Sequence, residues 1–216
     1  MSGNAEAPHW INIWEERMNT LLKSTIAISL FSLLAISANA QGNQGGPPVL
    51  AKDLAPARFG TTLRVTSSAF SSGGMIDGRY TQNGENVSPS LDWAKPPAGT
   101  RTLAVIVADA GVNRPEPIVH WIVYNIPSTM RHLSSQVVGD SSLPNGVMQG
   151  KNVSGKPGYI GPKPPAGQTH PYYFQVFALD RTLDIDPASA DRTTLINAMK
   201  GHVLASGSVV GRYTGQ

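Results

Sequence analysis

Two stretches of this sequence are apolar at almost every position, and they constrain the fold more than any other feature. Residues 103–107 read LAVIV, and residues 121–124 read WIVY. A strand with one solvated face alternates apolar and polar residues, whereas a strand covered on both faces reads as a nearly continuous apolar run. Both stretches are therefore predicted to be central strands of a sheet that is covered on both sides.

Shorter β-rich runs, each bounded by Gly, Pro or Asn, accompany these two stretches. The 22 glycines and 17 prolines, with charged residues at only 14%, agree with a turn-rich β protein. One core and a single domain are expected from the length. The predicted strands are residues 61–67, 102–109, 119–126, 172–179 and 208–213.

One helix is predicted near the C-terminus. Asp191 is suited to cap its first turn, and the apolar residues that follow recur at intervals of three and four, ending with Val203. Residues 140–167 are rich in Gly and Pro and are predicted as a long loop. Loops of that length in compact domains often carry function.

Residues 18–40 have the order of a signal peptide. Lys23 precedes an apolar stretch from Thr25 to Ile36, and residues 38–40 read ANA, the small-x-small pattern of a cleavage site. The stretch is shorter than the roughly 20 residues of a membrane span; the alternative is a buried core helix. The mature chain is therefore expected to be periplasmic or secreted, without a stable membrane anchor.

The boundaries of the remaining segments of the chain are predicted from the order and composition of their residues. Residues 1–17 precede the basic region, so they are expected to be an untranslated extension, with Met18 as the true start. Residues 41–57 contain GNQGGPP and few apolar anchors, and are predicted to be a flexible lead-in. Residues 58–216 are then the folded domain.

Composition also argues against several classes of function. Lys and Arg number 17 against 14 Asp and Glu, and this scattered net charge of +3 does not favour a nucleic-acid partner. The chain has no cysteine, which excludes disulfides, thiolate catalysis and Cys-ligated zinc. The GxSxG, HExxH and GxxxxGK[ST] motifs are absent, and no GxGxxG follows a strand. No catalytic residue, metal or cofactor is expected.

Polar residues that could form a binding site stand at the ends of three predicted strands. Asp109 closes one buried strand, His120 opens the next, and His170 with Tyr172 opens a third. Taken singly, Asp109 could be a turn residue, and either histidine could be a structural group with its hydrogen bonds satisfied. The four residues become a site only if the strand ends converge.

Four ordered blocks of sequence resemble the phosphatidylethanolamine-binding protein family, in its bacterial branch also called Raf kinase inhibitor-like. The first block contains NGENVSPSLDW followed by PAGT, and the second reads HWIVYNIP. The third contains GKN, GYIGPKPPAG and HPYYF, and the fourth, GHVLA, is similar to the family's C-terminal helix. The blocks are residues 83–100, 120–127, 150–174 and 201–205.

The resemblance implies a mainly β fold, an antiparallel β-sandwich with few helices and a small anion-binding cavity at one end of the large sheet. Where the family usually has Asp-Pro-Asp-Ala-Pro, residues 109–113 read DAGVN, so Asp109 matches either the first or, with a shift of one position, the second Asp. The ligand-binding residues carried over by motif are Asp109, His120, Gly161, Pro164, Pro165, His170 and Tyr172.

The leading hypothesis is an exported, non-enzymatic binding protein for a small anion such as phosphate or phosphoethanolamine. His120 and His170 are expected to donate hydrogen bonds to the anion, with Tyr172 as a further donor. Asp109 is expected to orient a histidine or to accept from an ammonium group. The loop from Gly161 to Pro165 is expected to form the cavity wall.

Two alternatives remain open. The first is an inhibitor of a protease or kinase, which the family name suggests and which would add a protein partner. The second is a metal-dependent hydrolase, because two histidines and one carboxylate, here His120, His170 and Asp109, can hold a divalent metal.

Overall fold

The computed structural model of this chain describes residues 46–216. The predicted extension 1–17, the predicted signal peptide 18–40 and the first residues of the lead-in lie outside the described range. No helix within residues 46–216 is long and apolar enough to cross a membrane. The elements, in chain order, are α2 (Ala51–Leu54), β1 (Val65–Thr66), η1 (Gly78–Tyr80), β2 (Leu91–Trp93), β3 (Thr102–Asp109), β4 (Ile118–Pro127), β5 (His132–Leu133), η2 (Pro144–Gly146), β6 (Met148–Gln149), β7 (Thr169–Leu179), α3 (Arg192–Met199) and β8 (Val203–Thr214).

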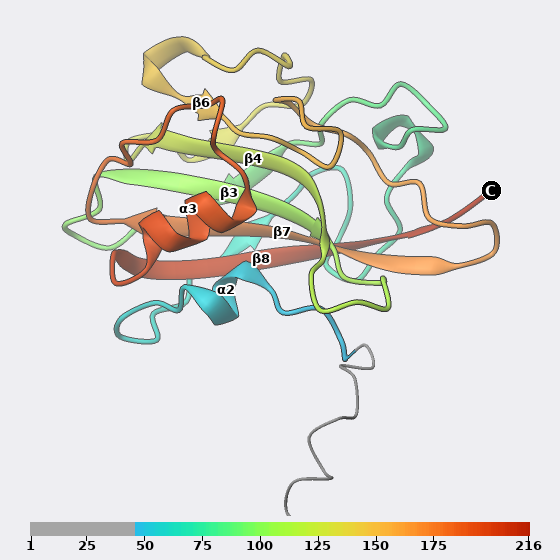
Figure 1. Cartoon of the computed structure of the whole chain (residues 1–216), viewed down its shortest axis with the longest axis horizontal. Coiled ribbons are helices and arrows are strands. Elements are labelled where there is room, and N and C mark those ends of the chain that lie inside the picture. The colour runs from blue at the N-terminus through green and yellow to red at the C-terminus, as the bar shows by residue number, and fades with distance from the viewer. Residues whose placement is uncertain (1–45) are drawn as a thin grey trace, which may run out of the picture. The chain divides into compact units, whose positions relative to one another are not determined.

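The strands form two antiparallel sheets, and this confirms the predicted fold class. The large sheet has five strands in the order β6-β4-β3-β7-β8, and the small sheet has three in the order β1-β2-β5. Strand β3 pairs with β4 on one side and β7 on the other, over its whole length. Both apolar runs of the sequence therefore lie in central strands of the large sheet (Figure 1).

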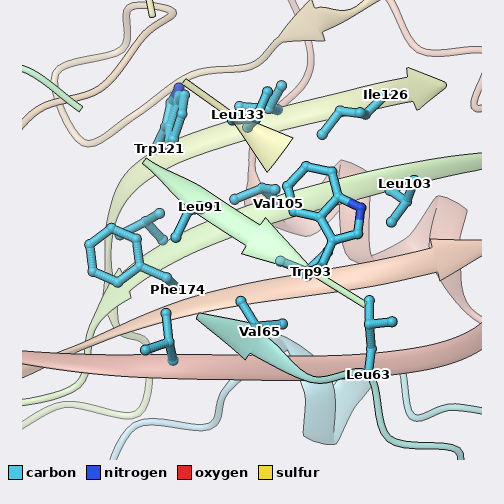
Figure 2. Packing of buried hydrophobic residues seen from close by; sticks show 14 of the residues in the cluster. Leu63, Val65, Leu91, Trp93, Leu103, Val105, Trp121, Ile126, Leu133 and Phe174 are labelled. Carbon is cyan, nitrogen blue, oxygen red and sulfur yellow. The ribbon is translucent and has the colours of Figure 1, made fainter. Parts of the chain in front are cut away.

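One hydrophobic core lies between the two sheets. Alternate residues of β3, at 103, 105 and 107, face the small sheet and meet Leu91 and Trp93 of β2. Figure 2 shows the side chains of Leu103, Val105, Leu91 and Trp93 together with those of Trp121, Leu133 and Phe174 between the sheets. This face of the large sheet also carries the candidate site at one end.

A second core lies on the opposite face of the large sheet. Residues 104 and 106 of β3 point that way and pack with Leu195, Ile196 and Met199 of α3. Helix α3 lies over this face in Figure 1. All eight residues of β3 are consequently buried, which explains why its sequence shows no alternation of apolar and polar residues.

The C-terminal helix was predicted with the correct start but the wrong end. Asp191 caps it as expected, because its Oδ1 accepts from the backbone N–H of Thr194 at 2.8 Å. The helix ends at Met199, and Gly201, with a φ of 75°, turns the chain back. Val203 therefore begins β8, so residues 201–205 do not form the helix that their resemblance suggested.

Several strand boundaries also differ from the prediction. Of residues 61–67, only Val65–Thr66 form a strand of the small sheet. The backbone N–H of Leu63 instead donates to the Ser206 carbonyl in β8, and the Ser206 N–H donates to the Thr61 carbonyl. Strand β8 runs from 203 to 214, longer than the predicted 208–213. Strands β2, β5 and β6 were not predicted, because two or three residues are too few to show a period of two.

Part of the segment predicted as a flexible lead-in packs against the rest of the domain. Leu50, Ala51 and Ala55 are 7%, 1% and 0% exposed, and the two alanines belong to the second core. The backbone N–H of Lys52 donates to Oε1 of Gln175 in β7 at 3.2 Å. Residues 50–55 therefore pack against the domain, because small alanines fit closely where a composition count finds few apolar anchors.

Candidate functional site

The ends of strands β3 and β7 bring three of the predicted site residues onto one face of the large sheet. Asp109, the last residue of β3, is the register partner of Tyr172 in β7. His170 lies two residues before Tyr172, so its side chain points to the same face. That face is the one directed toward the small sheet, because Tyr172 belongs to the core between the sheets.

Asp109 and His170 form a buried ion pair or hydrogen-bonded pair. Nδ1 of His170 lies 2.8 Å from Oδ2 of Asp109 and 3.1 Å from Oδ1. Oδ1 of Asp109 also accepts from the backbone N–H of Gly111 at 2.7 Å. The two side chains are only 4% and 8% exposed. Since a carboxylate only accepts, Nδ1 of His170 carries a proton, and the opposite ring nitrogen, Nε2, lies 3.4 Å from Oε1 of Gln168.

Gly111 packs directly against the His170 ring. A Cβ at position 111 would overlap the Cγ, Cβ and Cδ2 atoms of His170. The glycine thus lets the loop after β3 close over the imidazole, which is held between this loop and the Asp109 carboxylate. This gives a physical role to one of the positions at which the chain departs from the Asp-Pro-Asp-Ala-Pro pattern.

His120 reaches the same face through a β-bulge in β4. Trp121 is the register partner of Val107, but the next partner, Ala108, pairs with Val119, so β4 contains one extra residue at this point. A bulge of this kind re-aims a side chain next to a site. The His120 ring consequently meets the Tyr172 ring edge to face, with their centroids 5.2 Å apart.

The two nitrogens of His120 have different environments. Nδ1 lies 2.6 Å from the carbonyl oxygen of Ile160, whereas Nε2 is buried and has no hydrogen-bond partner among the described residues. Burial lowers the pKa of His120 below its ordinary value, against the opposing effects of the Ile160 carbonyl and the Asp109 carboxylate. This lowered pKa favours the neutral form of the His120 ring at neutral pH.

Tyr172 supplies a neutral hydroxyl. Burial, followed by the negative charge of Asp109, raises the pKa of Tyr172 far above its ordinary value. The residue is 1% exposed, and its hydroxyl lies near Asp109 and the backbone of Lys163. It remains protonated throughout the physiological range and can donate one hydrogen bond.

The Pro-rich loop is held in place by the first sequence block. The backbone N–H of Gly161 donates to Oδ1 of Asn86 at 2.7 Å, and Nε2 of Gln82 donates to the Gly161 carbonyl at 2.7 Å. A Cβ at Gly161 would meet the backbone of Tyr80 and Thr81. Because Ile160 precedes Gly161, these contacts also position the carbonyl that accepts the hydrogen bond from His120 Nδ1.

Only some of the predicted site residues therefore lie together in one cluster. Asp109, His120, His170 and Tyr172 form one cluster, and Gly161 borders it through its neighbour Ile160. Pro164 is buried and Pro165 is exposed, and their carbonyl oxygens lie close to Gly215 near the end of the chain. Both prolines contribute to the loop, not to the cluster of polar groups itself.

Sequence reasoning missed three residues that shape the cluster, Asn86, Gly111 and Ile160. Asn86 has a φ of 57°, a conformation that asparagine tolerates better than most residues, and its place within NGENVSP was the available signal. Gly111 was visible only as a departure from the family motif. Ile160 acts through its backbone, which no residue pattern reveals.

Two cavities in the described part of the chain lie away from this cluster. One, of about 640 Å³, lies between the α2 region and residues 206–208 of β8; the other, of about 350 Å³, is lined by residues 114–119, 151–155 and 191–193. Neither includes the four clustered residues. Within residues 46–216, no group of three or more His, Cys, Asp or Glu side chains is arranged to hold a metal ion.

A two-sheet antiparallel fold with a buried carboxylate–imidazole cluster at one end of its large sheet defines the class of protein. The sequence profile described as "Phosphatidylethanolamine-binding protein" matches residues 66–214. This chain belongs to the phosphatidylethanolamine-binding protein family.

Relatives from an archaeon and a bacterium agree with this assignment. A UPF0098 protein of Methanothermobacter thermautotrophicus is 40% identical over 152 residues, covering 70% of this chain and 98% of the relative. The UPF0098 protein YbhB of Escherichia coli is 33% identical over 159 residues, covering 70% of this chain and 100% of YbhB.

Two solved structures share the fold. The phosphatidylethanolamine-binding protein homologue CT736 of Chlamydia trachomatis aligns with a TM-score of 0.65 and 31% identity, over 72% of this chain and 99% of CT736. Escherichia coli YbcL, described as a member of the mammalian phosphatidylethanolamine-binding protein family, aligns with a TM-score of 0.66 and 28% identity, over 72% of this chain and 100% of YbcL.

Proposed function

We propose that this chain is an exported, non-enzymatic binding protein that takes a small oxyanion, phosphate or a phosphate-bearing head group, at the Asp109–His120–His170–Tyr172 cluster. The observation that carries the proposal is the buried pairing of His170 with Asp109, at 2.8 Å, next to a buried His120 nitrogen with no partner among the described residues. Polar groups this deeply buried are normally satisfied, so an unpartnered one points to a missing ligand or water.

The arrangement can recognise an anion without placing an isolated charge in the core. Asp109 orients the His170 ring and compensates the positive charge of its doubly protonated form, the form in which Nε2, beside Gln168, can donate to the anion. The Tyr172 hydroxyl is a second, neutral donor. In this proposal Asp109 supports His170, which is one of the two roles predicted for it from the sequence.

The size of the ligand is limited by burial. Asp109, His120, His170 and Tyr172 are 3%, 4%, 7% and 1% exposed. A ligand that reaches all four residues without moving the strands must be small, because most of the surrounding surface is protein. The proposal is therefore restricted to small anions such as inorganic phosphate and phosphoethanolamine.

Calorimetric titration of the purified protein with phosphate and with phosphoethanolamine tests the binding proposal. Mass spectrometry of molecules retained through native purification identifies a ligand that is already bound. We expect saturable binding of one anion per chain. Absence of binding by both anions, together with no retained phosphate compound, contradicts the proposed function.

The export part of the proposal rests on the basic, apolar and small-residue order of residues 18–40. N-terminal sequencing of the protein from fractionated cells tests it. We expect a mature chain that begins at Gln41 in the periplasmic or extracellular fraction. A cytoplasmic chain that retains residues 18–40 contradicts this part alone and leaves the binding proposal intact.

A further inference from the structure

The hydrogen bonding of His120 determines which of its nitrogens can face a ligand. Nδ1 lies 2.6 Å from the Ile160 carbonyl oxygen, which can only accept, so Nδ1 carries a proton. In a neutral ring the other nitrogen, Nε2, then has a lone pair and no hydrogen. This nitrogen is buried and unpartnered among residues 46–216.

The groups around His120 do not favour a second proton strongly enough to overcome its burial. Asp109 faces it from β3, Tyr172 from β7, and the Ile160 and Gly161 backbone from the Pro-rich loop. His170 and Tyr159 lie beyond Asp109 and Tyr172. Burial is nevertheless the larger effect, and it lowers the pKa of His120.

The cluster therefore contains an acceptor as well as donors. His170 Nε2 can donate to an anionic oxygen when that ring is doubly protonated, and the Tyr172 hydroxyl can donate as a neutral group, whereas Nε2 of the neutral His120 ring can only accept. A ligand oxygen placed against His120 Nε2 must bring its own hydrogen. Without it, two lone pairs face each other in a region that excludes water.

Taking the proposed anion site as given, we propose that it selects oxyanions that carry a dissociable proton, namely inorganic phosphate and phosphomonoesters, over sulfate and phosphodiesters. A phosphomonoester has a second pKa near 6 and therefore has an accessible P–OH form near neutral pH. Sulfate and phosphodiesters have no such hydrogen. The favoured chemistry includes a free phosphoethanolamine head group and excludes the phosphodiester of an intact phospholipid.

The proton balance of the complex is the same whichever atom holds the hydrogen. The ligand either keeps its proton and donates it to Nε2, or transfers it to Nε2 and binds as the dianion to a charged ring. In both cases the complex contains one proton that the ligand can supply. Sulfate and diesters must instead obtain that proton from solvent through protonation of a ring whose burial opposes it.

Four probes at pH 7 and constant ionic strength test the selectivity: inorganic phosphate, methyl phosphate, dimethyl phosphate and sulfate. Sulfate matches phosphate in size, and dimethyl phosphate matches the charge of the phosphate monoanion, so neither size nor charge alone reproduces the expected pattern. We expect phosphate and methyl phosphate to bind about tenfold or more tightly than the other two, as for sites that reject an analogue lacking a required hydrogen.

The outcomes separate this inference from the function on which it rests. Equal affinity for phosphate and sulfate overturns the selectivity and leaves an anion site in place. Binding of none of the four probes overturns the proposed function itself. Tighter binding of dimethyl phosphate than of methyl phosphate overturns the exclusion of phosphodiesters and favours an intact lipid as the ligand.

Nitrogen NMR of the imidazole rings provides a second measurement that needs no variant. We expect His120 at pH 7 to be neutral, with its proton on Nδ1 and an unprotonated Nε2 whose resonance moves when phosphate is added. A ring protonated on both nitrogens in the free protein overturns the inference. His120→Gln, whose amide can donate, is expected to reduce the preference for phosphate over sulfate, whereas His132→Gln on exposed β5 leaves it unchanged.

Discussion

Asp109 at the end of β3 and His170 on the neighbouring strand β7 are joined by a buried contact of 2.8 Å between Oδ2 and Nδ1. The carboxylate is shared, because its Oδ1 also holds the backbone N–H of Gly111. One side chain thus links the end of β3, the imidazole of β7 and the loop that follows β3. This connection is the structural centre of the proposed site.

Replacement of Asp109 by Ala is expected to destabilise the domain by about 2 to 4 kcal/mol. The change leaves the N–H groups of His170 Nδ1 and Gly111 without their acceptor, and an unsatisfied buried group costs about 1–3 kcal/mol. Denaturant unfolding of the variant measures the loss. Asp92→Ala, at an exposed position of β2, is the control and is expected to change stability by about 0.5 kcal/mol or less. Equal effects of the two substitutions contradict the prediction.

Gly111→Ala tests whether close packing of the loop positions His170. The added methyl group overlaps the imidazole, so the ring or the loop must move. We expect a stability loss of about 1–3 kcal/mol, typical of overpacking, together with weaker phosphate binding. Gly78→Ala is the control, because a Cβ there meets no atom within 4 Å. Unchanged phosphate affinity in Gly111→Ala would show that the ring position does not depend on this loop.

Asn86→Gly isolates the hydrogen bond that holds the Pro-rich loop. Glycine accepts the φ of 57° at this position, so the substitution removes the bond to the Gly161 N–H without adding backbone strain. We expect a stability loss of about 1–3 kcal/mol and reduced phosphate affinity, because Ile160 and His120 are displaced. Asn145→Gly, at a φ of 62°, is the matched control. Equal losses of stability and of phosphate affinity in the two variants would exclude this role for Asn86.

His120 is expected to make stability depend on pH below its ordinary pKa of 6.5. Burial lowers the folded-state pKa, so between that value and about 6.5 the unfolded chain binds more protons than the folded one. The contribution of His120 to the free energy of unfolding is therefore fully present above about pH 6.5. It declines as the pH falls, by at most about 1.4 kcal/mol per pH unit.

Unfolding free energies measured from about pH 5.5 to 8 test this dependence. The difference between wild type and His120→Gln is expected to be constant above about pH 6.5 and to shrink below it. His132→Gln, at an exposed position, is expected to retain the wild-type pH dependence. Parallel curves for wild type and His120→Gln contradict a lowered pKa at His120.

The predictable part of the fold is the part that depends on side-chain burial. The apolar run in β3 indicated a central strand because both of its faces are covered, and the Asp191 cap marked the start of α3. The helix end was missed because Val203 continues the apolar spacing although Gly201 has already turned the chain. Ala51 and Ala55 were missed because small residues gave little signal of burial.

The candidate site was accessible to sequence reasoning for a different reason. Asp109, His120, His170 and Tyr172 stand at strand ends, and the family resemblance grouped them. The sequence does not show the bulge that turns His120 toward Tyr172, because a bulge depends on pairing with another strand. The sequence also does not show that Nδ1 of His120 donates to the Ile160 carbonyl, because the acceptor is a backbone atom.

The most direct test of the account is the phosphate affinity of His170→Ala compared with wild type and with His132→Ala, measured by calorimetry on variants whose folding has been verified by circular dichroism. His170 lies in the cluster, whereas His132 is exposed on β5. The account predicts that His170→Ala weakens phosphate binding by about 1.5–3 kcal/mol, the range for a hydrogen bond to a charged group, while His132→Ala has no effect. Unchanged affinity in His170→Ala, or an equal loss in both variants, would contradict the proposed site.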